Sequence, residues 1–334
     1  MTGGKGGFHS FLACRLQAYL DFRQRLGYTS FAGSPAAVDF DRYLCFRDAG
    51  SLRDLDERLV AQWMHAIPRH AAATKNGKLR FARGFFAYLL RVGMLRGNPA
   101  SRIPYLKQKA YKPHIYTLKE IHQILEEARK NQRRYPRRLT GWTMETLVLL
   151  LYACGLRLGE ALNLRIQDVD FEENTLALWR TKFHKERLVP FSPAVRAKLL
   201  AYLARRNESY PPVGPQAPLF CGPHGKYCRH SIQARFRLLL VRCGLAKPKG
   251  RGGPRPHDLR HAFAVHRLYK WYQEGHDILN KLPLLSVYMG HVNIENTGVY
   301  LTITQAMLRE GDRRFQAAFE NVADKALGRA LKNP

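Results

Sequence analysis

Apolar side chains recur every three to four positions over most of this 334-residue chain, which is the period of an amphipathic α-helix. Residues 11–27 show the pattern in Leu12, Leu16, Tyr19, Leu20 and Leu26. Gly27 follows them where a helix C-cap favours glycine. Residues 34–50 begin with Ser34 and Pro35, an N-cap residue followed by proline at the first helical position. With residues 56–67 and 78–93, these segments predict a helical first domain.

The same period returns after residue 113 and is interrupted once. Helices are predicted at 117–130, 140–155, 192–206, 230–244 and from residue 257 onward. Between 159 and 191 the short runs "TLALWR" and "ERLVPF" flank "TKFHK", which predicts a β-hairpin. The proline-bearing, aperiodic stretch 96–114 is the best linker. We therefore expect a mainly α (α+β) chain with a helical domain at 1–108 and a mostly helical domain with a small antiparallel sheet at 113–334.

The chain is strongly basic, with a formal net charge of +29. Residues 1–112 carry 19 basic and 7 acidic side chains, and residues 113–334 carry 36 and 19, so both domains share the excess. A folded chain of this charge favours nucleic acid as its partner, and an anionic membrane surface is the alternative. No lipid-anchor pattern or basic amphipathic anchor is present, and we therefore expect double-stranded DNA rather than a membrane.

Cysteine usage and apolar runs indicate the compartment. The first twenty residues lack the apolar core of a secretory signal, and the longest apolar run, 147–156, is too short to span a bilayer. We expect a cytoplasmic, nucleoid-associated protein with six reduced cysteines. Cys221 and Cys228 in "CGPHGKYCRH" could suggest zinc, but no second ligand pair with zinc-finger spacing follows, so we interpret this stretch as a Gly/Pro turn.

The segment "HDLRHAFAVH" at 257–266 is the densest in chemically useful side chains. His257 and His261 are four residues apart, the spacing of a zinc-binding helix. In such a helix a glutamate follows the first histidine, whereas Asp258 follows here, and a convincing third ligand is lacking. His257 and Arg260, three residues apart, also share a helix face, so the segment could serve either a metal or an anion held by the arginine.

Further candidates accompany this segment, and each has a plain alternative. The complete set is Arg157, Lys182, His257, Arg260, His291 and Tyr300. Arg157 could form a surface ion pair with Glu160. Lys182 could be one more cation at a hairpin tip, His291 a residue at a helix C-terminus, and Tyr300 one of 16 tyrosines with Tyr288 as a nearby rival.

Four stretches together resemble the ordered sequence boxes of the tyrosine recombinases, or phage integrase family. These are "CGLRLGEALNL", "TKFHKERLVP", "HDLRHAFA" and "MGHVNIENTGVY". The resemblance covers residues ~113–310 through motifs, and ~10–105 only through the helical layout of that family's core-binding, SAM-like domain. Two departures stand out. Cys154 replaces the family's usual Thr or Ser, and the interval between the histidine boxes is long, as in transposon-type members. That interval adds His276, which we interpret as a surface histidine.

The resemblance implies a reaction and a role for each residue. Tyr300 would attack a DNA phosphodiester to give a 3′-phosphotyrosine and a free 5′-hydroxyl. Arg157, Arg260 and His291 would hold the phosphate oxygens. His257 would accept the tyrosine proton, Lys182 would protonate the leaving oxygen, and Glu160 would orient the site. The match assigns no chemistry to His261, and the reaction needs no metal, ATP or other cofactor.

The resemblance also implies an assembly. Four protomers would act on two DNA sites during integration, excision or transposition of a mobile element, with or without accessory recombinases. The tail, residues 303–334, has apolar residues at mainly helical intervals and would dock on a neighbouring protomer or on its own domain. The alternatives are a type IB topoisomerase-like enzyme that relaxes DNA and a catalytically silent DNA-binding accessory protein.

Overall fold

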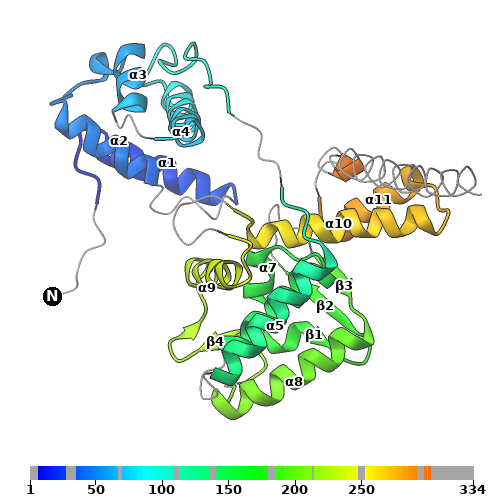
Figure 1. The fold of residues 1–334 in the computed structure, drawn as a ribbon. Coiled ribbons are helices and arrows are strands. Elements are labelled where there is room, and N and C mark those ends of the chain that lie inside the picture. The colour runs from blue at the N-terminus through cyan, green and yellow to red at the C-terminus, as the bar shows by residue number, and fades with distance from the viewer. Residues whose placement is uncertain are drawn as a thin grey trace, which may run out of the picture. The chain divides into compact units, whose positions relative to one another are not determined.

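The computed structural model divides the chain into two compact units, residues 1–111 and 112–334 (Figure 1). It describes residues 7–27, 35–66, 70–108, 113–134, 140–179, 186–212, 214–246, 253–291, 297–298 and 300–301. Within these ranges, no helix combines the length and the apolar character that crossing a membrane requires. Lys182, Ser34 and the tail 303–334 lie outside the described residues.

The first unit is a set of four helices around an aromatic core. They are α1 (Ala13–Arg25), α2 (Pro35–Phe46), α3 (Glu57–His65) and α4 (Ala72–Arg91), with a 3₁₀ turn at Leu52–Asp54. The ring of Phe40 packs against Trp63, Phe81 and Phe85 with centroids 4.7–6.3 Å apart. Asp56 caps α3 by accepting the Leu59 N–H. The four predicted helices are confirmed, and Gly27 has the positive φ of a C-cap glycine.

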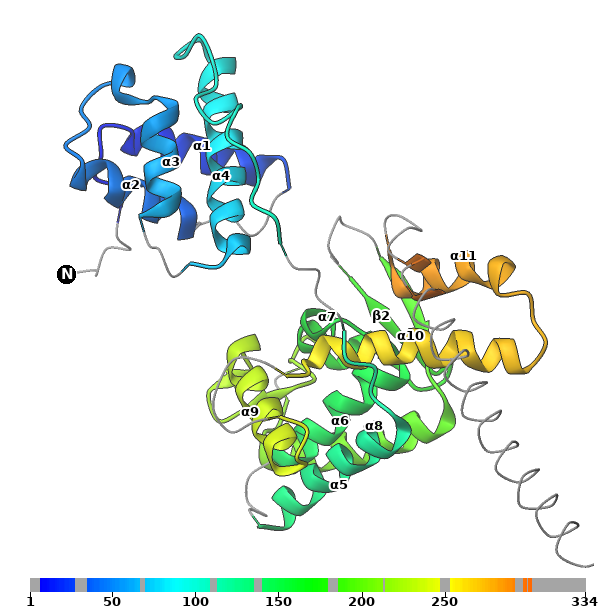
Figure 2. The ribbon, with the colours of Figure 1, turned by 45° about the horizontal axis from the view of Figure 1, so that its top comes forward.

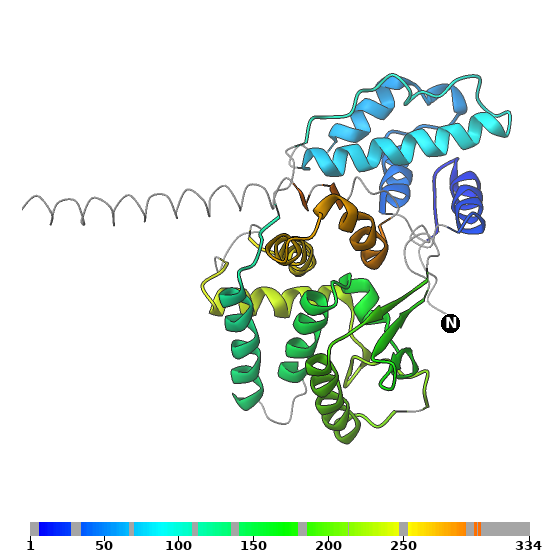
Figure 3. The ribbon, with the colours of Figure 1, turned by 90° about the vertical axis from the view of Figure 1, so that its right-hand side faces the viewer.

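One boundary and part of the predicted linker were wrong. Helix α4 begins at residue 72 rather than 78, and its buried Asn76 exchanges two hydrogen bonds with the backbone of Leu106. Arg83 donates to the carbonyls of Ala100, Ser101 and Ile103. The chain therefore runs back along α4 as part of the first unit (Figure 3). Long-range hydrogen bonds, which local periodicity cannot reveal, decide both the start of α4 and the place of the segment predicted as a linker.

The second unit is built around the buried helix α6. Its helices are α5 (Leu118–Arg134), α6 (Thr140–Ala153), α7 (Leu158–Asn163), α8 (Pro193–Ser209), α9 (Arg229–Arg242), α10 (Pro256–Gln273) and α11 (Ile278–Met289), with a 3₁₀ turn at Ile166–Asp168. Helix α6 packs against α5, α8 and α10 (Figure 2). Nine of its 14 residues are buried and none is exposed, because apolar residues occur on all of its sides.

Two small antiparallel sheets complete the second unit. Strands β1 (Val169–Asp170), β2 (Thr175–Leu178) and β3 (Arg187–Pro190) form one sheet in that order, with Leu176 opposite Val189. Strands β4 (Cys221–Gly222) and β5 (Gly225–Lys226) form a short hairpin where a Gly/Pro turn was expected. The hairpin predicted from the runs at 175–180 and 186–191 is confirmed by the pairing of β2 with β3, and the chain is mainly α with small antiparallel sheets.

Helices α10 and α11 pack side by side and enclose a second small core (Figures 1 and 2). Phe263, Leu268, Leu285 and Met289 contribute to it, and so does Tyr300. Helix α11 ends at Met289, and its C-cap residue, Gly290, adopts φ +64°. Met289 and Tyr300 of the last sequence box are therefore held against α10 by apolar packing.

Candidate functional site

Arg157 and Glu160 are positioned by a tight turn between α6 and α7. Gly155 makes this turn with φ +59°, and a Cβ there would lie 2.6 Å from Phe263 Cδ1. Only glycine fits such a close approach with a positive φ. Arg157 directly precedes α7, and the Glu160 carboxylate accepts its backbone N–H at 2.9 Å. The motif "CGLRLGEAL" thus fixes the arginine and the glutamate relative to each other.

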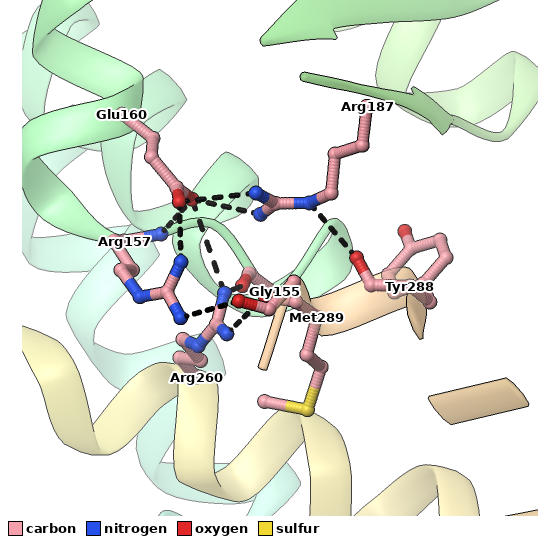
Figure 4. A network of polar contacts seen from close by, with 8 residues as sticks. Gly155, Arg157, Glu160, Arg187, Arg260, Tyr288 and Met289 are labelled. Carbon is pink, nitrogen blue, oxygen red and sulfur yellow. Dashed lines mark hydrogen bonds and ion pairs between the residues drawn. The ribbon is translucent and has the colours of Figure 1, made fainter. Parts of the chain in front are cut away.

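The Glu160 carboxylate is the acceptor on which the basic residues converge (Figure 4). Arg157 Nη1 donates to it at 2.7 Å. Arg187 reaches both of its oxygens with a two-pronged contact, at 3.1 and 2.9 Å. Arg260 Nη1 lies 3.9 Å away. Burial would raise the pKa of Glu160, but the hydrogen bonds and charge of Arg187 outweigh it, helped by Arg157 and Arg260, and the pKa falls to about 2.

Arg187 was missed by the sequence analysis, which considered only the lysine of its box. Besides Glu160, its Nε donates to the Tyr288 carbonyl at 3.0 Å (Figure 4). Arg187 therefore ties β3 to the start of α7 and to the end of α11. A signal was available in the sequence: Arg187 shares a strand face with the buried Val189, and a charged residue on a buried face needs a partner.

Arg260 links three segments from the interior. Its side chain is 1% exposed. Nη1 donates to the Gly155 carbonyl at 2.5 Å and Nη2 to the Met289 carbonyl (Figure 4). Burial, and next the charge of Arg157, lower the pKa of this guanidinium, while Glu160 opposes the shift. By contrast the Arg157 side chain is 28% exposed, and its Nη2 donates to the Gly290 carbonyl at 3.0 Å.

The histidines of the two boxes meet at Tyr300. His261 Nδ1 lies 2.9 Å from the Tyr300 hydroxyl oxygen. The His257 ring packs against the His261 ring with centroids 4.7 Å apart. The His291 ring is stacked with that of Tyr300 at 6.3 Å, and its Nδ1 lies 2.8 Å from Thr297 Oγ1. His261, to which the motifs assign no role, thus contacts the tyrosine hydroxyl.

Burial sets the protonation states of this cluster. It lowers the pKa of His257 and of His291 to about 4, with contributions from Arg260 in both cases. It also lowers the pKa of His261. The pKa of Tyr300 is raised by burial, against the opposing charge of Arg260 and Arg157. At neutral pH the site therefore presents neutral imidazoles and a protonated phenol beside cationic guanidinium groups.

Six of the seven predicted site residues lie together in the second unit. They are Arg157, Glu160, His257, Arg260, His291 and Tyr300. Lys182, the seventh, lies outside the described residues. The rival Tyr288 stacks on Phe263 and directs its hydroxyl to the Pro190 carbonyl at 3.4 Å.

The other residues noted in the sequence lie apart from this cluster's contacts. Cys154 is buried in the core, where burial raises the pKa of its thiol to about 12. His276 is exposed beside Glu274. Cys221 lies in β4, and Cys228 precedes α9. In the part of the chain that the structure describes, no three His, Cys, Asp or Glu side chains form a group able to hold a metal ion.

A family model and individual relatives of known sequence point to the same protein family. The model of the phage integrase family matches residues 115–307. The putative integrase/recombinase y4rB of Sinorhizobium fredii (strain NBRC 101917 / NGR234) is 32% identical over 308 residues, covering 92% of this chain and 97% of that protein. The tyrosine recombinase XerC of Myxococcus xanthus is 28% identical over 278 residues, covering 82% of this chain and 86% of that protein.

Solved structures share the fold. The XerH site-specific recombinase bound to a palindromic difH substrate superimposes with a TM-score of 0.61 at 21% identity, covering 90% of this chain and 83% of that chain. The Tn1549 transposon integrase in complex with a circular intermediate DNA gives 0.63 at 17% identity, covering 86% and 94%. The sequence matches extend over most of both chains and include the four boxes, and the protein therefore belongs to the phage integrase family, that of the tyrosine recombinases.

Proposed function

We propose that this protein is a site-specific DNA recombinase that cuts and rejoins DNA through a 3′-phosphotyrosine at Tyr300. The observation that carries the proposal is the buried Tyr300 hydroxyl beside a neutral histidine and within the field of Arg157 and Arg260. A tyrosine that attacks phosphorus must lose its proton, and the phosphorus it attacks gains negative charge on its non-bridging oxygens. The cluster supplies groups for both needs without a cofactor.

Each side chain then has a role that its position supports. Two of the five side-chain N–H groups of Arg157 donate to Glu160 and Gly290, so the partly exposed fork retains donors for a phosphate. A preorganised donor of this kind contributes on the order of 10²–10³ in rate. His291 adds a hydrogen bond to the same phosphate. A histidine of α10 accepts the tyrosine proton, a role that the family resemblance assigns to His257.

Arg260 requires a movement. Its guanidinium is buried and donates to the carbonyls of Gly155 and Met289. A phosphate can exchange with these acceptors only if the chain near Met289 shifts when DNA binds. Lys182 is proposed as the acid that protonates the departing 5′-oxygen, because an alkoxide is a poor leaving group.

The biological role proposed is integration, excision or transposition of a mobile element at the nucleoid. Four protomers on two DNA sites, with or without accessory recombinases, would exchange strands. The net charge of +29 favours such extended contact with phosphates. In this assembly, the tail 303–334 is proposed to dock on the neighbouring protomer.

The test is covalent capture. The full chain is incubated in EDTA with a library of nicked duplexes of random sequence, and detergent-resistant protein–DNA adducts are isolated and sequenced. We expect one enriched sequence, with the protein on a 3′-phosphate. Tyr300→Phe should abolish the adduct and leave the gel shift of the recovered sequence nearly unchanged, while Tyr288→Phe, the matched control, should still form it. An adduct that survives in Tyr300→Phe would contradict the proposal.

A further inference from the structure

His261 makes a polar contact with the Tyr300 hydroxyl. Its Nδ1 lies 2.9 Å from the hydroxyl oxygen, which is hydrogen-bonding distance. Tyr300 is 3% exposed, so bulk water has little access to this pair. His257 lies one turn earlier on α10, and its ring packs against the ring of His261. It is not interposed between His261 and Tyr300.

The surroundings of His261 favour a neutral ring. Burial lowers its pKa first; Arg260 and Arg255 lower it further, and Asp258, one turn earlier, opposes them. His257 is also held neutral, partly by His261 itself. A neutral imidazole that carries its proton on Nε2 has a lone pair on Nδ1. That lone pair would face the hydroxyl whose proton must leave.

We propose that His261, through Nδ1, is the base that takes the Tyr300 proton during DNA cleavage; this rests on the function proposed above. The Tyr300 O–H bond breaks and its proton goes to Nδ1, while the phenolic oxygen forms a bond to phosphorus. The bond from phosphorus to the 5′-oxygen breaks, and that oxygen takes a proton from the general acid. In rejoining, the same steps run backwards, and His261 returns the proton to Tyr300.

The electrostatics link this transfer to DNA binding. Burial, Arg260 and Arg255 oppose the imidazolium that would form at His261, while Asp258 stabilises it. A phosphate held between Arg157 and Arg260 adds negative charge and offsets them. His261 therefore becomes a better proton acceptor when a phosphodiester is bound than when the site holds none, and substrate binding promotes the activation of Tyr300.

Three asparagine variants test the assignment. Asparagine at 261 places an amide near the Nδ1 position, which can hydrogen-bond but cannot take a proton. With the nicked duplex recovered by adduct capture, we expect His261→Asn to slow single-turnover cleavage by about 100-fold or more. His257→Asn should slow it less, and His276→Asn, an exposed control, should not change it. Cleavage by His261→Asn within about threefold of the unmodified protein, or a larger loss in His257→Asn, overturns the proposal.

A modified substrate separates the base from the acid. Replacing the bridging 5′-oxygen by sulfur gives a leaving group that needs no proton. Lys182→Ala should recover its rate on this duplex, which shows that the probe reports on the leaving group. His261→Asn should remain slow, because its defect concerns the attacking oxygen. Recovery of His261→Asn on the sulfur duplex would place His261 at the leaving group and overturn the assignment.

Measurements on the unmodified full chain keep the proposal testable if the variant does not fold. Imidazole ¹⁵N spectra should show His261 neutral with its proton on Nε2, and a proton on Nδ1 would overturn the proposal. The cleavage rate should fall with slope one as the pH drops below the kinetic pKa of His261, and a flat profile would also count against it.

If no adduct forms with any duplex, the proposed function itself fails; if adducts form and His261→Asn cleaves normally, only this inference fails.

Discussion

A single carboxylate, Glu160, holds two arginines of the site in place. Its side chain is 6% exposed and receives Arg157 and both prongs of Arg187. Breaking such a buried pair from one side leaves an uncompensated charge, which costs more than the pair contributes. Glu160 therefore positions Arg157, and Arg187 positions Glu160.

Replacing Arg187 by lysine tests this arrangement. Lysine keeps the charge but cannot make the two-pronged contact and the bond to the Tyr288 carbonyl together. We expect Arg187→Lys to lower the free energy of unfolding by about 1–3 kcal/mol, measured by urea denaturation, and to slow adduct formation. The control, Arg205→Lys, alters an exposed pair with Glu208 and should change stability by less than about 0.5 kcal/mol. Equal unfolding midpoints for the two variants would contradict this role.

At the scale of elements, the end of α11 sets the position of His291, from which the chain continues to Tyr300. The Gly290 carbonyl accepts from Arg157, and the backbone N–H of His291 donates to Ser286. A Cβ at Gly290 would lie 2.7 Å from Arg187 Nη1. Glu160 and the Tyr288 carbonyl hold Arg187, so it cannot move aside without losing those bonds.

Two glycine variants separate backbone strain from this close contact. Gly275, after α10, has φ +76° and open space around a Cβ, whereas Gly290 has φ +64° and the arginine. We expect Gly275→Ala to cost about 1–2 kcal/mol from the left-handed conformation alone. Gly290→Ala should cost more and should also slow adduct formation. Thermal melting and the adduct rate measure the two effects, and identical results for both variants would show that the contact with Arg187 has no role.

For the whole molecule, the two units have separate cores and both carry positive charge. The aromatic core of the first unit lies entirely within residues 12–103, and the cores of the second begin at Tyr116. Each therefore buries its own apolar surface. In the proposed function, both units contact the phosphates of the same duplex.

A fragment of residues 113–334 tests whether both units contact DNA. It keeps the described site and 36 basic against 19 acidic residues, so it should still attract DNA. Because fewer phosphates are neutralised, log affinity should fall less steeply with log salt concentration than for the full chain. Titrations of one duplex by both proteins at several salt concentrations measure the slopes. Equal slopes would mean that residues 1–112 do not contact DNA.

Much of the fold could be read from local pattern. The period of the apolar residues predicted α1, α2, α3 and most helices of the second unit, because burial of one helix face is a property of residues three and four apart. The short helix α7 was not predicted, since it falls where the helical period is interrupted. The hairpin at β2 and β3 followed from two short runs of β-forming residues. The boxes predicted which residues of the second unit lie together, and their catalytic roles, together with Lys182 and the tail 303–334, stay predictions.

Contacts between distant residues settled the rest. His261 meets Tyr300 across 39 positions, and Arg187 meets Glu160 across 27. Asn76 and Arg83 draw residues 100–106 onto α4 in the same way. Such contacts depend on how helices and strands pack, since a hydrogen bond needs its two atoms within about 3 Å. The sequence names the side chains of the site, but the packing of α10, α11 and β3 selects the histidine that touches the tyrosine and the arginine that holds Glu160.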